Sequence, residues 1–165
     1  MTWAIFAVGW INVGDFDRSA PHFQRGYANV HKPFNVWTES PTGGTINFIT
    51  GAGGFLQSAI FGTSGMRLVT DGLTFLPPPP TATGSAATRL GVRSFHFRGN
   101  RLAQSVTADK ATYELLSAKD GAPALALETD SDGGAGAGGG GGSATALQVG
   151  KPVTVNRAYA KIVLK

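Results

Sequence analysis

The hydrophobic period of the chain changes within FLQSAIFGTSGMRLVTDGLTF, residues 55–75. Four apolar residues of its first part fall at helical spacing, Phe55, Leu56, Ala59 and Ile60. Residues 66–75 instead alternate on both sides of Asp71-Gly72, a dipeptide that indicates a tight β-hairpin turn. The sequence therefore predicts an α+β chain, with helices over residues 1–65 and antiparallel strands over 66–165.

Three helices are expected before the change of period. One helical face is apolar and consists of Trp3, Phe6, Trp10 and Val13. A second helix is predicted over residues 19–31, with Ser19 as its N-cap and Pro33 just beyond its end. Residues 33–53 are predicted to form a long loop, and the third helix is predicted over 54–62.

The second part of the chain has the turn signals of a β-rich domain. Residues 87–116 predict a three-stranded meander with turns at Gly99-Asn100 and Ala108-Asp109. The phase of the apolar residues shifts near Arg93, which indicates a β-bulge. Further strands are expected in ALALE and in residues 151–165, and the glycine-rich segment 133–143 predicts a flexible loop.

Composition narrows the classes of protein that fit. The chain has 165 residues, of which 42% are hydrophobic, enough for one core or two small domains. Its net charge of +4 is dispersed, and the first 50 residues carry three basic and three acidic side chains. Without a Lys/Arg run, nucleic-acid binding is not expected. The apolar N-terminus lacks the basic region and cleavage site of a signal peptide, and no segment suggests a membrane partner.

Metal sites are not expected. The chain has no cysteine, which favours a reducing compartment and a cytoplasmic location. His22, His31 and His96 have no metal-ligand spacing. The segment that begins at Asp130 resembles the start of a calcium loop, but it lacks the later oxygen ligands.

Two short motifs suggest a binding site, and each also has an ordinary structural explanation. Glu39 stands alone in VWTES beside Trp37, and a flat ring next to a carboxylate suits a sugar-binding wall. The same segment also suits a solvated loop. TGAGG, residues 50–54, could present backbone N–H groups at a helix N-terminus to an oxygen-rich ligand, or could form a tight turn.

Longer blocks carry a resemblance to a known family. MTWAIFAVGW, ANVHKPFNVWTE, NFITGAGGFLQSAIFG and the DGLTFLPPPP hairpin together resemble glycoside hydrolase family 65, over most of residues 1–105. The resemblance implies that residues 1–65 are the last helices of a catalytic (α/α)6 barrel and that 66–165 form a small C-terminal β-sandwich domain. It also implies that Met1 is an internal residue of a buried helix in a longer enzyme.

The resemblance further implies a reaction and its residues. Hydrolases of this family invert the anomeric carbon, using one carboxylic acid and one carboxylate that activates water. The glutamate of the WTE element, Glu39, resembles that general base. Trp37 and Thr38 would shape the wall beside it. Three glycines would let the backbone approach substrate or water: Gly51, Gly53 and Gly54.

The implied general acid belongs to barrel sequence that these 165 residues do not contain. The chain alone is therefore expected to lack glucosidase activity. The implied substrate is an α-glucoside, such as glucosyl-galactosyl-hydroxylysine or a glucose disaccharide, and no metal or organic cofactor is needed. Two other readings remain open, a non-catalytic carbohydrate-binding or interaction module and a truncated gene product.

Overall fold

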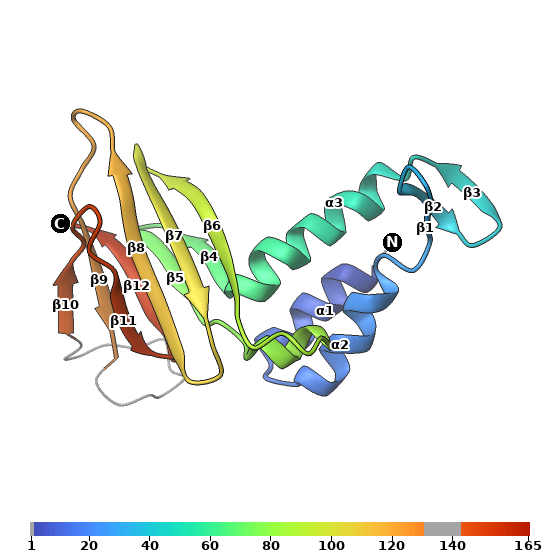
Figure 1. Ribbon diagram of the computed structural model, residues 1–165, viewed down its shortest axis with the longest axis horizontal. Coiled ribbons are helices and arrows are strands. Elements are labelled where there is room, and N and C mark those ends of the chain that lie inside the picture. Colours follow the sequence, from blue (N-terminus) through green and yellow to red (C-terminus); the bar gives the residue numbers. More distant parts are fainter. Residues whose placement is uncertain (1, 131–142) are drawn as a thin grey trace. The chain divides into compact units, whose positions relative to one another are not determined.

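The computed structural model describes residues 2–130 and 143–165 (Figure 1). The chain is α+β, with three N-terminal helices followed by antiparallel β-sheets, as the sequence predicts. It divides into two compact units. The helical unit comprises the residues up to Thr63 together with Thr81–Ala87, and the β unit comprises Ser64–Pro80 with Thr88–Lys165. That these units are a barrel fragment and a C-terminal domain stays a prediction.

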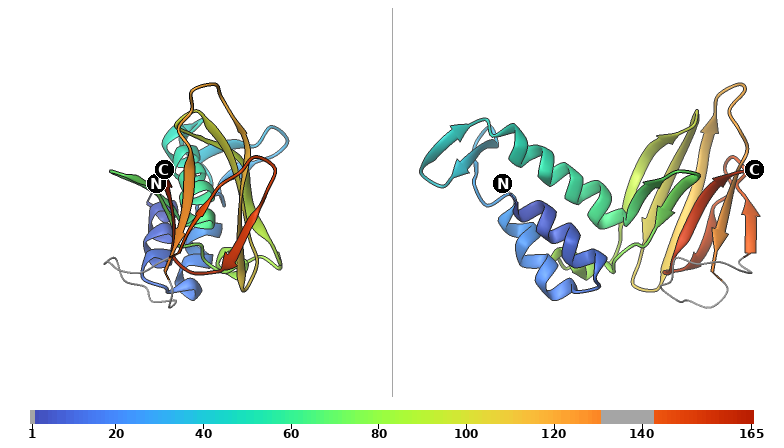
Figure 2. Two further views of the ribbon diagram at one scale, coloured as in Figure 1. Left: turned by 90° about the vertical axis from the view of Figure 1, so that its left-hand side faces the viewer. Right: turned by 180° about the vertical axis from the view of Figure 1, so that it is seen from behind.

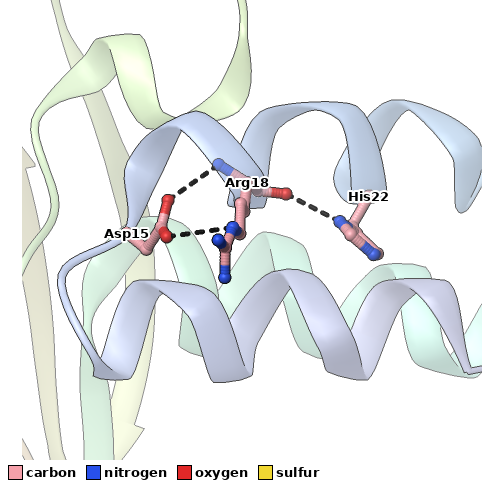
Figure 3. A network of polar contacts seen from close by, with 3 residues as sticks. All are labelled: Asp15, Arg18 and His22. Carbon is pink, nitrogen blue, oxygen red and sulfur yellow. Dashed lines mark hydrogen bonds and ion pairs between the residues drawn. The ribbon is translucent and has the colours of Figure 1, made fainter.

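The second helix begins earlier than its sequence suggests. Helices α1 (Trp3–Asn12) and α2 (Phe16–Arg25) are joined by a short turn. Asp15 caps α2, because its Oδ1 accepts from the Arg18 N–H at 3.0 Å and its Oδ2 lies 3.3 Å from Arg18 Nε (Figure 3). The prediction of a helix over residues 19–31 with Ser19 as N-cap is therefore wrong at both ends. Ser19 is buried within α2 and donates to the Ala7 carbonyl at 3.1 Å.

Aromatic and cationic side chains border the contact between α1 and α2, in which Ala4, Ala7 and Ser19 are the buried residues. The His22 ring lies 5.8 Å from the rings of both Trp3 and Phe6, and its Nδ1 lies 2.7 Å from the Arg18 carbonyl (Figure 3). Because a carbonyl can only accept, Nδ1 carries the proton. The Arg18 guanidinium stacks on Trp10 at 4.8 Å. The three aromatic residues of the face predicted for the first helix thus contact α2 through His22, while Phe6 stays 50% exposed and Val13 71% exposed.

Residues predicted as a long loop contain regular structure. Strands β1 (Val30–His31), β2 (Val36–Ser40) and β3 (Gly43–Ile46) form a three-stranded antiparallel sheet. Helix α3 (Ile49–Gln57) starts five residues before its predicted beginning and continues into a π-helical turn, η1 (Ser58–Gly62). Glycines are poor helix formers, so the glycines of TGAGG do not predict the helical turns that they form here.

The β unit consists of two antiparallel sheets (Figures 1 and 2). The five-stranded sheet has the order β10-β9-β12-β5-β4, and the four-stranded sheet has the order β11-β8-β7-β6. The strands of the first sheet are β4 (Met66–Val69), β5 (Gly72–Phe75), β9 (Leu125–Thr129), β10 (Ser143–Ala146) and β12 (Ala160–Leu164). The strands of the second are β6 (Leu90–Phe97), β7 (Asn100–Val106), β8 (Lys110–Ala118) and β11 (Val153–Asn156). A short 3-10 helix, η2 (Pro80–Thr83), follows the proline run.

One core joins the two sheets into a sandwich. Phe75 of β5 is fully buried, and its ring lies 4.9 Å from that of Tyr113 on β8 and 6.1 Å from that of Phe95 on β6. Leu102 and Ile162 are also fully buried in the same cluster. Every buried member of this core comes from the β unit, so that unit encloses its own apolar interior.

The predicted strands and bulge are found, with shifts of one residue at two turns. Val69 pairs with Gly72, so the first hairpin turns at residues 70–71 rather than at Asp71-Gly72. A Cβ on Gly72 would lie 2.2 Å from the Ile162 carbonyl oxygen, so this glycine serves strand pairing. The next turn is Arg98-Gly99, where both φ angles are positive, as a type I′ turn requires. The register shift between Val92 and Phe95 confirms the bulge.

Two further expectations concern the glycine-rich segment and membrane-spanning helices. The predicted flexible loop at 133–143 lies outside the described residues, except that Ser143 begins β10. Within residues 2–130 and 143–165, no helix is long and apolar enough to cross a membrane.

The buried Tyr113 predicts a dependence of stability on alkaline pH. Burial raises the pKa of this phenol well above its ordinary value. The unfolded chain loses the Tyr113 proton at about pH 10, while the folded chain keeps it. The free energy of unfolding should therefore fall above pH 10, by about 1.4 kcal/mol per pH unit. Urea denaturation between pH 8 and 11 measures this slope.

Tyr113→Phe should make the alkaline slope shallower, because phenylalanine cannot ionise. Tyr159→Phe provides the control, because this substitution makes the same chemical change at a ring that is only partly buried. An unchanged slope in Tyr113→Phe would contradict the assignment.

Candidate active site

Four of the six predicted site residues line one small hollow in the helical unit: Trp37, Thr38, Glu39 and Gly51. Its volume is about 30 Å³, which suits about one water molecule and is too small for a sugar ring. Six further residues, none of them among the predicted site residues, also line it: Trp3, Ala4, Arg25, Gly26, Asn29 and Phe48. The described residues thus form a wall with a water-sized depression.

Glu39 lies on strand β2 and not on a loop, which corrects the expected local structure. Its side chain is exposed, and Oε2 accepts from the Thr45 N–H on β3 at 3.4 Å. Its backbone carbonyl accepts from the Asn29 side-chain amide at 3.1 Å. The strand pair and Asn29 therefore fix the backbone at this carboxylate.

Thr38 anchors the neighbouring backbone through its hydroxyl. Its Oγ1 lies 2.7 Å from the Ser40 carbonyl, 3.2 Å from the Asn29 carbonyl and 2.9 Å from His31 Nε2. The carbonyls can only accept, so they share the hydroxyl proton and His31 Nε2 donates to Thr38. The Thr38 N–H also donates to Asn29 at 3.2 Å. The side chain of Thr38 is thus committed to holding β2 in place.

Trp37 belongs partly to the core of the helical unit. Its ring lies 5.2 Å from that of Phe55, which in turn contacts the rings of Phe23 and Tyr27 at 5.6 and 5.7 Å. Its carbonyl accepts from the Phe48 N–H at 2.8 Å, at the start of α3. This bond ties the strand that carries Glu39 to the helix that carries the glycines.

The three predicted glycines do not act together. Gly51 is buried in the first turn of α3, and a Cβ there would lie 2.6 Å from the Phe48 ring. Only glycine fits at this position without a shift of that ring. Gly53 and Gly54 lie two and three residues further along α3 and do not line the hollow.

The site has a simple charge pattern. Glu39 is the only carboxylate among the residues that line the hollow, and Arg25 is the only cation. The Arg25 guanidinium stacks on the Trp3 ring at 4.8 Å, which holds it beside the opening. A carboxylate beside a space of this size can take a proton from a water molecule that occupies it. Residues 2–130 and 143–165 contain no group of three or more His, Asp or Glu placed to hold a metal ion.

Gly44 restrains the Glu39 side chain, and this predicts a local effect of mutation. Gly44 has φ +80, and an added Cβ would lie 2.8 Å from Glu39 Cβ and 3.0 Å from Oε2. Gly44→Ala should therefore displace Glu39 and destabilise the protein by about 1–2 kcal/mol. Gly43→Ala is the matched control, because its Cβ would meet nothing within 4 Å. Thermal unfolding should separate the two variants, and equal melting temperatures would contradict the crowding.

The chain is homologous to part of several known glycoside hydrolases. It is 42% identical over 130 residues, 78% of its length, to a mouse protein-glucosylgalactosylhydroxylysine glucosidase. The Dictyostelium discoideum protein of that name is 36% identical over 118 residues, 71% of the chain. A kojibiose hydrolase of Mucilaginibacter mallensis is 36% identical over 75 residues, 45% of the chain.

The chain spans only 18%, 16% and 11% of the length of these three relatives. No protein-family model matches it. No solved structure matches it either.

Proposed function

We propose that the chain is part of an inverting α-glucosidase of glycoside hydrolase family 65, with Glu39 as the general base. One observation carries the proposal. In a chain homologous to part of known glucosidases, a lone carboxylate lines a water-sized hollow together with Trp37, Thr38 and Gly51. That arrangement suits activation of a single water molecule.

The proposed step needs one water and two carboxyl groups. Glu39 takes a proton from the water in the hollow while the water oxygen attacks the anomeric carbon. The bond between that carbon and the glycosidic oxygen breaks, and a carboxylic acid gives its proton to the leaving oxygen. The two carboxyl groups of an inverting enzyme stand about 6.5–9.5 Å apart, which leaves room for the water.

The general acid is proposed to come from sequence beyond these 165 residues. The other acidic residues of the helical unit, Asp15 and Asp17, do not line the hollow, and Asp15 caps α2. In the proposed enzyme the helical unit forms the last helices of an (α/α)6 barrel. Large apolar side chains that are at least 50% exposed, such as Ile5, Phe6 and Leu56, support packing against further helices.

The proposed substrates follow from the names of the relatives. These are α-glucosides such as kojibiose or glucosyl-galactosyl-hydroxylysine. Trp37, Thr38 and Gly51 would shape the wall beside the sugar. Gly53 and Gly54 are proposed only to keep the adjoining face of α3 free of bulky side chains. A cytoplasmic location remains part of the proposal, supported by the absence of cysteine.

A hybrid enzyme tests this function. In it, the homologous segment of the mouse glucosidase is replaced by this chain, and glucose release from both α-glucosides is measured. The proposal expects turnover by the hybrid and none by the 165-residue chain alone. A folded hybrid that binds but does not hydrolyse either substrate would count against it.

A further inference from the structure

The outer face of the four-stranded sheet contains a hollow that the proposed hydrolysis does not use. Its volume is about 620 Å³, within the range of small-molecule sites. Alternate residues of β7, such as Leu102 and Val106, are fully buried, so Ala103 and Ser105 lie on the opposite face. All residues that line this hollow belong to the β unit.

Small side chains on neighbouring strands explain the hollow. Gly91 on β6 pairs with Ser105 on β7, which pairs with Thr112 on β8. A Cβ on Gly91 would lie 2.2 Å from the Gln104 carbonyl oxygen, so a larger residue cannot replace this glycine without moving the strand. Ala103 is a further small residue in the lining. The floor of the hollow therefore consists of short side chains on three neighbouring strands.

Charged side chains border this floor. Arg89 and Arg93 line the hollow from the side of β6, and Glu114 lines it from β8. The bulge between Val92 and Phe95 returns Phe95 to the core and leaves Arg93 exposed. Among residues 2–130 and 143–165, neither arginine nor Glu114 forms an ion pair. Two cations and one carboxylate thus line one hollow, and none of them is paired with another charged group of the described residues.

We propose that this hollow binds an anionic sugar. The phosphate or carboxylate of the sugar would contact Arg89 and Arg93, since guanidinium groups recognise such anions through paired hydrogen bonds. The sugar hydroxyls would donate to Glu114 and exchange hydrogen bonds with Ser105 and Thr112. This site does not involve Glu39, so the proposal of anionic-sugar binding can be correct whether or not the proposed hydrolysis is.

Amide chemical-shift titration of the full chain tests the site. The probes are glucose 6-phosphate and glucuronate, with glucose and inorganic phosphate as the two separate halves of the chemistry. At least one anionic sugar should produce saturable shifts at Gly91, Ser105 and Thr112, and should bind more tightly than either half. The absence of saturable shifts with both anionic sugars would overturn the proposal. Binding of inorganic phosphate as tight as that of the anionic sugar would also overturn it.

Variants separate the site from general electrostatic attraction. Arg89→Gln with Arg93→Gln should weaken anionic-sugar binding by about tenfold or more. Lys119→Gln removes a positive charge outside the hollow and should leave the affinity within about twofold. Glu114→Gln should weaken the binding of the anionic sugar but not the binding of inorganic phosphate. Equal losses in Lys119→Gln and the double variant would contradict the site, as would equal effects of Glu114→Gln on both probes.

Discussion

Replacement of Glu39 by glutamine is expected to lower kcat of the hybrid glucosidase by about 10²–10⁴-fold, the usual contribution of a general base. Glutamine keeps the size of the side chain but cannot accept a proton from water. The backbone carbonyl that accepts from Asn29 is unchanged by the substitution, and the glutamine amide oxygen can accept from the Thr45 N–H in place of Oε2. Initial rates of glucose release from kojibiose measure the effect.

Two controls make that result specific. Glu39→Gln should unfold at nearly the same temperature as the parent hybrid, because the side chain is exposed. Asp17→Asn removes an exposed carboxylate of the same unit away from the hollow and should retain near-normal turnover. Near-normal rates in Glu39→Gln would exclude it as the base and would leave the proposed reaction without its proton acceptor.

Local patterns predicted most elements, and the errors arose where two local signals competed. Asp15 and Ser19 are both good N-cap residues, and sequence alone does not show that Ser19 is needed inside α2 to bond Ala7. The start of α3 was missed because glycine has low helix propensity. In the structure, Gly51 is required by the Phe48 ring that lies over it, a contact that no periodicity reveals.

The wall around Glu39 was partly predictable because three of its residues are consecutive in the chain. Trp37, Thr38 and Glu39 all lie on β2, so their backbones are adjacent in any fold, although consecutive side chains of a strand point to opposite faces. Arg25 reaches the same hollow from the end of α2, and Asn29 reaches it from the segment after that helix. A polar residue just before a short strand was the only sequence signal for Asn29, and it is too common to identify a site.

Substitution of Phe75 by alanine is expected to destabilise the β unit by about 3–5 kcal/mol. Phe75 is completely buried, with 0% of its surface accessible to solvent. Its ring contacts the rings of Tyr113 and Phe95 in the facing sheet. Removing it opens a cavity between two sheets that strand pairing holds in position, so collapse can fill it only in part. Since small domains have total stabilities of about 5–15 kcal/mol, the loss is a large share.

Urea denaturation followed by near-ultraviolet circular dichroism measures this loss, because the signal depends on the packing of Tyr113 and its aromatic neighbours. Leu68→Ala is the comparison, since Leu68 lies on the adjacent strand β4 and is 75% exposed. Its substitution should change the free energy of unfolding by less than about 0.5 kcal/mol. Similar losses in both variants would mean that the interior between the sheets does not determine the stability of the β unit. A loss confined to Phe75→Ala would instead place that stability in the contact between β5 and the facing sheet, independently of any chemistry at Glu39.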